Sequence, residues 1–378
     1  MKNKTIYIDV TQYTQNRLNT GIQRVVNQYL KRAITGNFEI VILYINSSNH
    51  FMQLSNSEMQ EFLEDVKDYK FKSFKHIDIF ESKNQKIFFD IDSVWNSLYK
   101  RELLYKQLKE NNFKIYNFIY DLIPILFPKL LHEKTKQNFA PYIKAIYKYS
   151  DFVFFDSNSA KNDFFKIKKE FNYKKDISSK VVYLGSDIVK PFEKPNDNYI
   201  DILSKKYILF VGTIEPRKLQ PLLLDAFEEL YETYHNLNLV FIGKTGWNIQ
   251  KFTSYLNTHP LKDKNIFHFE NIDDNNLNHF YKNAFLVTYL SIYEGYGLPI
   301  AESLNHSNIT IVSKNSSTPE VGGDFVDYVT DNSKENLINI IFKYLKNKNM
   351  YKNKKNMILK GYKPISWDAF YQSMERNI

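Results

Sequence analysis

The chain has 378 residues, of which 43% are hydrophobic, so it is too long for one ordinary core and fits two domains of typical size. Its net charge of +9 is compatible with solvated lysine-rich faces, or with affinity for nucleotides, phosphates or an acidic membrane surface. The absence of cysteine excludes disulfides and cysteine-bound metals. The N-terminal residues MKNKTIYIDVTQ lack the apolar run of a signal peptide, and no segment approaches the ~20 apolar residues of a membrane span. We therefore expect a cytoplasmic protein.

Short apolar runs alternate with amphipathic stretches along the whole chain, which predicts an α/β fold. The runs read as strands cover residues 4–10, 39–45, 85–91, 113–120, 151–157, 180–184, 207–213, 237–243, 265–270, 285–290 and 309–313. Helical spacing is clear in residues 21–34, 220–236 and 276–284. Strands buried on both faces with helices between them imply parallel sheets.

The segment PFEKPNDNYIDILSKK, residues 191–206, has two prolines, many polar residues and no clear strand, so we interpret it as a domain linker. Each half then begins with a strand, a loop and a helix. This pattern predicts two Rossmann-like, doubly wound parallel-sheet domains that face each other. Ligands of such sheets lie beyond the carboxyl ends of the strands, which would line a cleft between the domains.

Three places in the first half could contribute to a site in that cleft. Gly21 lies at a loop-to-helix junction in NTGIQRVV, where it could approach a phosphate or sugar or could be a plain turn residue. Asp121 follows a strand in NFIYDLIP, where it could orient a proton or bind hydroxyls, or could cap a helix or turn ahead of Pro124. Asp90 and Asp92 in FFDID have the D-x-D spacing of a divalent-metal site, although paired acids at a strand end are usually solvated.

In the second half, VGTIEPRK follows a strand and precedes a helix. Gly212 ends the strand, and Arg217 and Lys218 place two cations beside the start of the helix. This arrangement suits a diphosphate, because Arg binds two oxygens as a fork and Lys adds a point charge. A basic loop without a ligand is the alternative, and the residues alone leave both open.

The stretch EGYGLPIAE follows the last long apolar run. Gly295 and Gly297 allow close approach to a ligand, and Pro299 fits the start of a helix. Glu294 precedes the loop and we place Glu302 in the first helical turn, so the two carboxylates flank a loop–helix junction instead of sharing one helical face. Each could accept hydroxyls of a sugar, although acidic residues are also ordinary at a helix start.

Several other classes of site are excluded by spacing. LVFIGKTGW lacks the first glycine of a P-loop, because Asn238 occupies that position before Gly243. The histidines show no H-x-x-x-H pattern, and no G-x-G-x-x-G follows the first strand of either half, which disfavours a Rossmann dehydrogenase.

Taken in order, VGTIEPRK, IGKTGW and YEGYGLPIAE resemble the donor domain of retaining GT-B glycosyltransferases of family 4. TGIQRVV, DLIPILFP, SNSAKNDF and VVYLGSD resemble the acceptor domain of that family, and SWDAFYQSM resembles its closing helix. Within the family the set looks most like mannosyltransferases of O-antigen (lipopolysaccharide) and capsule assembly. The resemblance implies an acceptor domain over residues 1–190, a donor domain over 191–360 and a helix over 361–378 that crosses back to the first domain.

The resemblance also implies a role for each matching residue. Arg217 and Lys218 would bind the donor diphosphate, Glu302 the ribose and Glu294 the transferred sugar. The implied catalytic residues are Arg217, Lys218, Glu294 and Asp121. The implied donor-binding residues are Gly21, Gly212, Thr213, Arg217, Lys218, Glu294, Gly295, Tyr296, Gly297, Leu298 and Glu302. Such enzymes need neither a metal nor another cofactor. They resemble same-face substitution enzymes, in which the departing phosphate itself helps to deprotonate the acceptor.

Two positions depart from the family pattern. Thr213 stands where many relatives have an arginine, so phosphate binding would fall to Arg217, Lys218 or another group. Tyr120 stands where many have a histidine, which makes Asp121 the better candidate for acceptor contacts.

We therefore expect an α-retaining hexosyltransferase that uses a nucleotide-diphosphate sugar, with GDP-mannose as the leading guess. The expected acceptor is a glycan, growing on a polyisoprenoid lipid, with peripheral contact to an anionic membrane and no nucleic acid among the partners. Two alternatives stay open: a metal-dependent transferase that uses Asp90 and Asp92, and a non-catalytic protein that binds sugar nucleotides or glycans.

Overall fold

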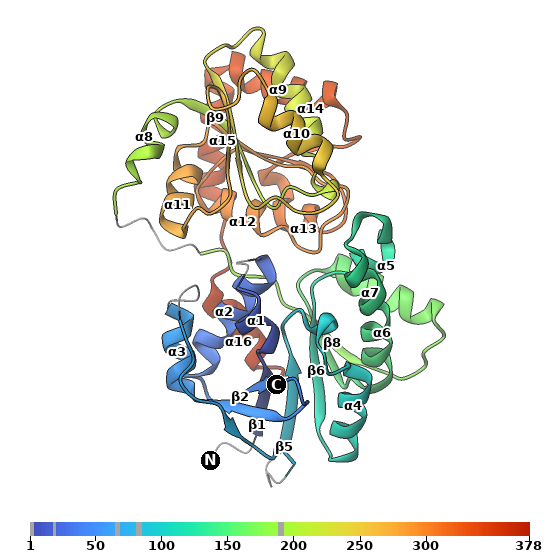
Figure 1. The fold of residues 1–378 in the computed structure, drawn as a ribbon. Helices are drawn as coiled ribbons and strands as arrows, with labels where there is room; N and C mark the ends of the chain where they lie inside the picture. The colour runs from blue at the N-terminus through green and yellow to red at the C-terminus, as the bar shows by residue number, and fades with distance from the viewer. Residues whose placement is uncertain (1–3, 18–19, 65–68, 81–84, 188–192) are drawn as a thin grey trace. The chain divides into compact units, whose positions relative to one another are not determined.

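The computed structural model describes residues 4–17, 20–64, 69–80, 85–187 and 193–378, and its contacts divide the chain into two compact units (Figure 1). Unit 1 comprises residues 1–185 and 367–378, and unit 2 comprises residues 186–366. The chain thus divides after residues 185 and 366, a few positions from the expected 190 and 360.

Unit 1 is built on a sheet of eight strands in the order β4-β3-β2-β1-β5-β6-β7-β8. The strands are β1 (Lys4–Asp9), β2 (Glu39–Ile45), β3 (Phe51–Leu54), β4 (Lys75–His76), β5 (Gln85–Asp90), β6 (Lys114–Ile119), β7 (Phe152–Phe155) and β8 (Ser178–Val181). In this order the neighbouring strands β2, β1, β5, β6, β7 and β8 pair in parallel. Strands β3 and β4 pair antiparallel and form one edge of the sheet. The prediction of parallel strands is therefore wrong for this edge, which contains strands of four and two residues.

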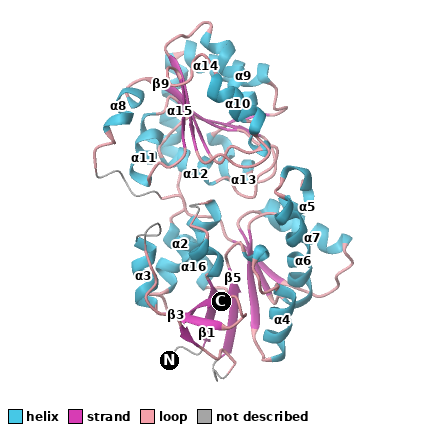
Figure 2. Cartoon of the chain, viewed as in Figure 1, coloured by secondary structure: helices cyan, strands magenta, loops and turns pink. Residues whose placement is uncertain are grey.

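Helices cover both faces of this sheet (Figures 1 and 2). They are α1 (Thr11–Gln15), α2 (Gly21–Ala33), α3 (Asn56–Glu64), α4 (Arg101–Glu110), α5 (Ile123–Leu126), α6 (Glu133–Tyr149), α7 (Asn158–Glu170) and α16 (Trp367–Glu375), with short 3-10 turns η1 (Val94–Asn96) and η2 (Pro128–Leu130). Helices α4, α6 and α7 bury their apolar residues with Tyr7, Leu43 and Phe88 of the sheet. On the other face, Tyr29 of α2 contacts both Phe89 and Tyr371, so the C-terminal helix α16 is part of unit 1.

Unit 2 has six strands, all parallel, in the order β11-β10-β9-β12-β13-β14. They are β9 (Lys206–Val211), β10 (Leu237–Ile242), β11 (Ile266–Phe269), β12 (Leu286–Tyr289), β13 (Thr310–Ser313) and β14 (Asp327–Val329). Renumbered within the unit, this is the doubly wound order 3-2-1-4-5-6. The predicted α/β class with two doubly wound sheets is confirmed.

The two faces of this sheet are filled by alternate residues of each strand, as its period of two requires. Ile208 and Phe210 of β9 pack with α9, α10, α12, α14 and α15, whereas Tyr207 and Leu209 pack with α8 and α11. The helices of the unit are α8 (Asp197–Leu203), α9 (Gln220–Tyr231), α10 (Gln250–Thr258), α11 (Asp274–Asn283), α12 (Leu298–Asn305), α13 (Thr318–Gly322), α14 (Lys334–Lys346) and α15 (Lys348–Gly361), with 3-10 turns η3 (Pro216–Lys218) and η4 (Gly323–Phe325).

The interpretation of residues 191–206 as a linker is wrong for most of its described part. Residues 191 and 192 lie outside the described residues, and helix α8 and the start of β9 occupy much of the remainder. Asn196 caps α8 by accepting a hydrogen bond from the Asn198 amide, and Ile202 is buried in the core of unit 2. The two prolines precede the helix and do not interrupt it.

The loops that follow β9 and β10 are joined backbone to backbone. The Gly212 amide donates to Ile242 at 2.8 Å, and the Ile214 amide donates to Lys244 at 2.9 Å. Gly243 has φ +150°, and a Cβ atom at this position would lie 2.2 Å from the Gly212 carbonyl oxygen. Glycine is therefore required at residue 243 for steric reasons, because the loop that holds the basic residues passes directly over it.

A Gly243→Ala variant should unfold at a lower urea concentration than the wild type, with a loss of about 1–3 kcal/mol from crowding and unfavourable φ. Gly323→Ala is the matched control, since Gly323 also has positive φ (+49°) but a Cβ there meets nothing within 4 Å. Equal losses in the two variants would show that φ, and not the close approach to Gly212, makes glycine necessary.

Candidate functional site

The doubly wound order of unit 2 reverses direction between β9 and β12, which are hydrogen-bonded neighbours. Ligands of such sheets bind beyond the carboxyl ends of the strands at this switch point. Arg217 and Lys218 lie in η3 after β9, and Glu294 lies after β12. The fold therefore brings these three predicted residues to one point, although 76 positions separate Lys218 from Glu294.

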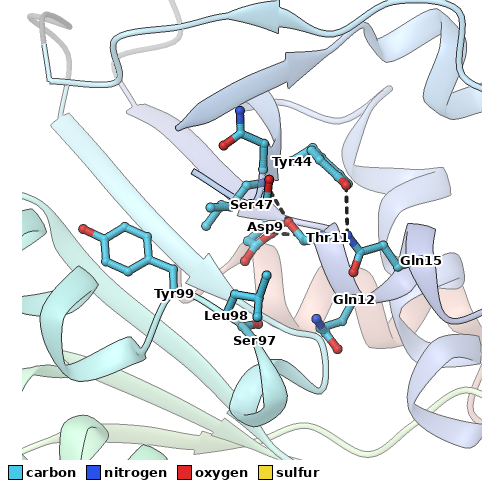
Figure 3. Close-up of a pocket in the computed structure, with 11 residues that line it drawn as sticks. Asp9, Thr11, Gln12, Gln15, Tyr44, Ser47, Ser97, Leu98 and Tyr99 are labelled. Carbon is cyan, nitrogen blue, oxygen red and sulfur yellow. Dashed lines mark hydrogen bonds between the residues drawn. The ribbon is translucent and has the colours of Figure 1, made fainter. Parts of the chain in front are cut away.

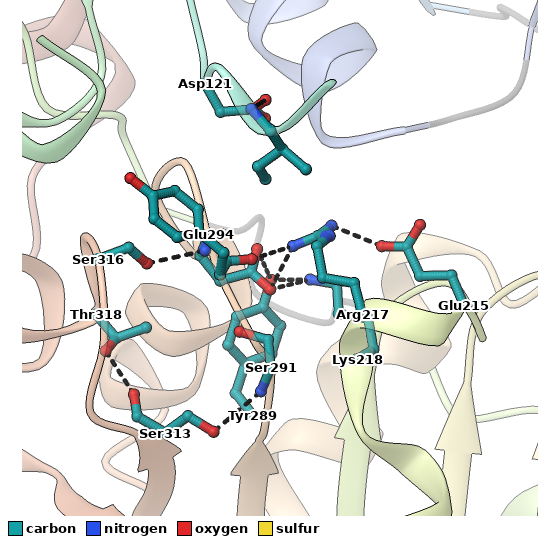
Figure 4. Close-up of polar contacts among 12 residues, drawn as sticks. Asp121, Glu215, Arg217, Lys218, Tyr289, Ser291, Glu294, Ser313, Ser316 and Thr318 are labelled. Carbon is teal, nitrogen blue, oxygen red and sulfur yellow. Dashed lines mark hydrogen bonds and ion pairs between the residues drawn. The ribbon is translucent and has the colours of Figure 1, made fainter. Parts of the chain in front are cut away.

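These side chains form a compact ionic cluster (Figure 4). The Lys218 ammonium and the Arg217 guanidinium both contact Oε1 of Glu294 at 2.7 Å. Arg217 also donates to Glu215 and to the Tyr293 carbonyl oxygen, both at 2.6 Å. Two cations thus face two carboxylates, and Glu294 is the residue that holds the cations together.

Lys218 and Glu294 are buried and Arg217 is partly exposed, and burial together with the charges of the cluster shifts the ionisation of its members. Burial alone would raise the pKa of Glu294, but Arg217 and Lys218 overcome it and lower that pKa to about 2. Burial lowers the pKa of Lys218, whereas Glu294 and Glu215 keep that of Arg217 above its ordinary value. Glu294 is therefore an anion at neutral pH, an acceptor and not a proton donor.

Tyr289, at the end of β12, is part of the same cluster and was not identified from the sequence. Lys218 donates to the Tyr289 hydroxyl at 2.5 Å, and that hydroxyl donates to Oε2 of Glu294 at 3.1 Å. The ammonium also lies 4.3 Å from the centre of the ring. Because Tyr289 is buried, its hydroxyl fixes Lys218 and Glu294 without competition from water.

A Tyr289→Phe variant should be less stable than the wild type by about 1–3 kcal/mol, because the buried ammonium loses an acceptor. Tyr255→Phe is a control in the same unit, since the Tyr255 hydroxyl contacts Glu228 at an exposed position. Urea denaturation of both variants measures the difference. An unchanged midpoint for Tyr289→Phe would mean that the hydroxyl does not support the cluster.

The backbone of the EGYG loop is held by small polar residues of the segment after β13. The Ser317 hydroxyl contacts the carbonyl oxygens of Glu294 and Tyr296 at 3.1 and 2.9 Å, and the Glu294 amide donates to Ser316 Oγ at 2.9 Å. These serines were not singled out from the sequence. The sequence signal for them was the run KNSST, residues 314–318, which directly follows the next predicted strand and therefore lies at the same edge of the sheet.

Helix α12 begins directly after this loop. Gly297 precedes it with φ +101°, a conformation that side chains rarely adopt, and Leu298 is its first residue. Glu302 is the fifth residue of the helix, so its predicted place in the first turn is wrong. Its carboxylate is buried and accepts a hydrogen bond from the Tyr281 hydroxyl at 2.9 Å.

The remaining residues predicted in the second half lie nearby in the chain. Gly212 has φ +149° at the end of β9. The carbonyl oxygen of Thr213 accepts a hydrogen bond from the Gln220 side chain at 2.9 Å, which ties the loop to the start of α9. Gly295 lies within the loop that Ser317 holds.

The two predicted residues of the first half belong to unit 1. Asp121 Oδ1 accepts a hydrogen bond from the Ile123 amide at 2.9 Å, which is the turn arrangement considered as its alternative. Gly21 is the first residue of α2, and Thr20 caps that helix through the Gln23 amide.

Asp90 and Asp92 differ in their surroundings. Arg101 contacts Asp90 at 2.7 Å and Asp9 at 2.5 Å, and all three side chains are buried. The Tyr105 hydroxyl also donates to Asp90 at 2.5 Å. Asp92 accepts from the Ser93 amide at 2.6 Å, and burial raises its pKa to about 6. Asp90 is thus a partner in a buried ion pair, a role that the D-x-D spacing did not indicate.

Comparisons with known proteins agree with this arrangement. Residues 197–363 match the family model described as glycosyl transferases group 1. The serotype-specific mannosyltransferase WbdA of Escherichia coli is 29% identical over 195 residues, which are 49% of this chain but only 24% of WbdA. The O-antigen chain mannosyltransferase B of Escherichia coli is 34% identical over 119 residues, 31% of each chain. The matched regions are therefore about a quarter to a third of these relatives.

Solved structures are similar over nearly the whole chain. Anabaena Alr3699/HepE, crystallised with UDP and glucose, has a TM-score of 0.69 at 14% identity and covers 100% of this chain and 99% of its own. WaaG, a glycosyltransferase involved in lipopolysaccharide biosynthesis, has a TM-score of 0.57 at 11% identity with 98% of each chain covered. At these identities the likeness establishes the fold. Residues 197–363 thus match the family model of glycosyl transferases group 1, and the chain has the GT-B fold of these solved structures.

Proposed function

We propose that this protein is a retaining, metal-independent glycosyltransferase that moves a hexose from a nucleotide-diphosphate sugar to a glycan. The observation that carries the proposal is the buried cluster of Arg217, Lys218 and Glu294 at the switch point of unit 2, inside the matched family region. Buried cations at this place in a doubly wound sheet suit a diphosphate better than any uncharged ligand.

The roles of the cluster follow from its contacts. An ammonium has three donors, and the described contacts of Lys218 with Tyr289 and Glu294 take two of them, which leaves one for a phosphate oxygen. The Arg217 guanidinium lies beside it, held by Glu215, Glu294 and the Tyr293 carbonyl oxygen, and adds a second positive charge. As the bond to the transferred sugar breaks, negative charge grows on the diphosphate, and cations already fixed in position stabilise it without reorganisation.

Glu294 takes part in both binding and charge balance. Without donor it neutralises Lys218 and Arg217, so two cations can be buried side by side. With donor bound, the diphosphate supplies negative charge to the same cations. The carboxylate of Glu294 then remains an acceptor for sugar hydroxyls, while the Glu302 carboxylate in α12 binds the ribose.

The sugar and acceptor follow from the relatives. WbdA and mannosyltransferase B are named as mannosyltransferases, which favours mannose and GDP-mannose as donor, although the HepE structure holds UDP and glucose. We propose a glycan or polyisoprenoid-linked acceptor in surface polysaccharide synthesis, used at the inner face of the cytoplasmic membrane. We propose that this contact with lipid is peripheral. Among the described residues no helix has the length and apolar character that a membrane crossing requires.

Nucleotide release from a panel of sugar nucleotides, with and without mannosyl acceptors, tests the proposal. We expect one donor to be turned over and its product to keep the α configuration, read by NMR of the anomeric proton. Activity should persist with excess chelator, because Arg217 and Lys218 take the place of a metal. Tight donor binding without any turnover would instead identify a non-catalytic sugar-nucleotide binder.

A further inference from the structure

Unit 1 contains a cavity of about 190 Å³ that the preceding function does not use (Figure 3). It lies where β1 and β2 end and where the loop after β5 returns, and its walls include Asp9, Thr11, Asn46 and Ser97. In the parallel part of this sheet, β2 and β5 flank β1 on opposite sides, so the cavity lies at the switch point of unit 1. This is the place where a doubly wound sheet binds its ligand.

The chemistry of the wall favours an uncharged ligand. None of the described residues that line the cavity is a lysine or arginine, and Asp9 is its one carboxylate. Asp9 is already engaged: Oδ1 accepts from the Thr11 amide at 2.9 Å and the Thr11 hydroxyl at 2.5 Å, and Oδ2 accepts from Arg101 at 2.5 Å. Arg101 is shared with Asp90, so the charge behind the wall is negative and disfavours phosphates.

The uncharged polar groups of the wall are of the kind that binds hydroxyl groups. Gln12, Gln15, Tyr44, Asn46 and Ser47 present amides and hydroxyls, of which Asn46 Oδ1 already accepts from the Ser48 and His50 amides. The Gln15 side chain donates a hydrogen bond to the Tyr44 hydroxyl at 2.9 Å, drawn as a dashed line in Figure 3.

Ser97 supplies a second, independent indication that the cavity binds a ligand. Its side chain is 6% exposed, it lines the cavity, and its hydroxyl has no hydrogen-bond partner among the described residues. A buried hydroxyl without a partner costs about 1–3 kcal/mol, so such groups are rare in the absence of a ligand or ordered water. A hydroxyl of a bound molecule would satisfy it.

The volume of the cavity and the apolar residues of its wall further restrict the class of ligand that it can bind. The cavity is smaller than the about 300–1,000 Å³ of pockets for drug-sized molecules, so it suits a single ring. Leu98, which is 76% exposed, and the ring of Tyr99 belong to the same wall and can cover the C–H face of a sugar. We propose that this cavity binds one neutral monosaccharide unit.

The binding of a monosaccharide in this cavity does not depend on the proposed function. The identification of that monosaccharide as part of the acceptor does depend on it. If the protein transfers hexose from a donor held in unit 2, the sugar bound here is the terminal residue of the acceptor glycan, or a residue next to it. That interpretation rests on the proposed function and places part of the acceptor recognition on Ser97 and its neighbours.

Saturation-transfer NMR with methyl α-mannoside and methyl α-glucoside tests the site on the full chain, with mannose 6-phosphate as the charged probe. We expect at least one neutral glycoside to bind and the phosphate not to bind. Ser97→Ala should weaken that binding about 2- to 12-fold, the effect of one lost neutral hydrogen bond. The same variant should keep or raise the melting temperature, because it removes an unpaired buried hydroxyl. Gln15→Ala at the exposed rim is a second variant, and Ser48→Ala, just outside the wall, is the matched control.

The outcomes separate this site from the donor site. Loss of glycoside binding in Ser97→Ala and Gln15→Ala with unchanged nucleotide binding supports the cavity as a sugar site. Absence of glycoside binding, equal weakening by Ser48→Ala, or preferred binding of the phosphate overturns it. If wild-type protein binds nucleotide diphosphates but no glycoside, the inference fails while the proposed function stands; the opposite result leaves the cavity and removes the donor site.

Discussion

Replacement of Lys218 by methionine is expected to lower donor turnover by about 10²–10³-fold, the effect of removing one fixed donor to a developing anion. Methionine keeps most of the length and apolar bulk of the side chain, so the buried space stays filled. What is lost is the ammonium that contacts Glu294 and Tyr289. Because the charge on the leaving diphosphate grows only as the bond breaks, kcat should fall more than donor KM rises.

Lys205→Met is the matched control for this prediction. Lys205 belongs to the same unit, is exposed and pairs with Asp201 at 2.6 Å, so the same change in net charge should leave kcat within about twofold. Circular dichroism and melting curves confirm that both variants are folded. Near-normal turnover by Lys218→Met would remove the diphosphate role and, with it, the main support for the transferase assignment.

Replacement of Arg101 by methionine should destabilise unit 1 by about 3–5 kcal/mol, the largest effect on stability that we expect. Arg101 is the shared partner of Asp9 and Asp90, and all three side chains are buried. The variant leaves two carboxylates close together without a cation. Burial already raises the pKa of Asp90, and loss of the guanidinium raises it further.

The raised pKa of Asp90 determines how the stability loss in Arg101→Met depends on pH. A carboxylate whose pKa is higher in the folded state than in the unfolded state destabilises the fold above that pKa, and the penalty disappears as protonation neutralises it. The difference between wild type and Arg101→Met should therefore shrink as the pH is lowered. A second change, Asp90→Asn, should recover part of the loss in Arg101→Met at neutral pH.

Tryptophan fluorescence follows unit 1 in a Trp247→Phe background, because the other two tryptophans, Trp95 and Trp367, belong to that unit. Arg32→Met is the matched control, since Arg32 pairs with the exposed Asp368 at 2.6 Å and should cost less than about 1 kcal/mol. Equal losses for the two arginine variants, or a difference that grows at low pH, would contradict the buried-pair account.

The sequence predicted the long strands and the class of fold because their signals are local. Eleven apolar runs were expected, and each overlaps a strand, from β1 to β13 with β3 and β4 excepted. The strands missed were β3, β4 and β14, which have four, two and three residues and lie toward the edges of the sheets. Helix α8 was missed because the prolines that precede it and its own polar residues also suit a linker.

The residues of the candidate site were named from the sequence, but their relation to one another was not. Arg217 and Lys218 were assigned to a diphosphate and Glu294 to a sugar, whereas the structure joins all three in one ionic cluster. Tyr289, Ser316 and Ser317 were missed, since a hydroxyl in or after an apolar strand has no pattern of its own. Arg101 was missed because its partner Asp9 lies 92 positions away, so no local pattern links the two residues.

By itself, the sequence determined which long apolar segments become strands, where glycines permit tight turns, and which charged residues end at a strand's carboxyl edge. Those features depend on the polarity and backbone freedom of residues that are adjacent in the sequence. Only the tertiary structure decided that β9 lies beside β12, so that Lys218 meets Glu294, and that β1 lies beside β5, so that Arg101 neutralises Asp9 and Asp90. Strand order depends on how helices bury whole sheet faces, and this is a property of the packed unit and not of any segment.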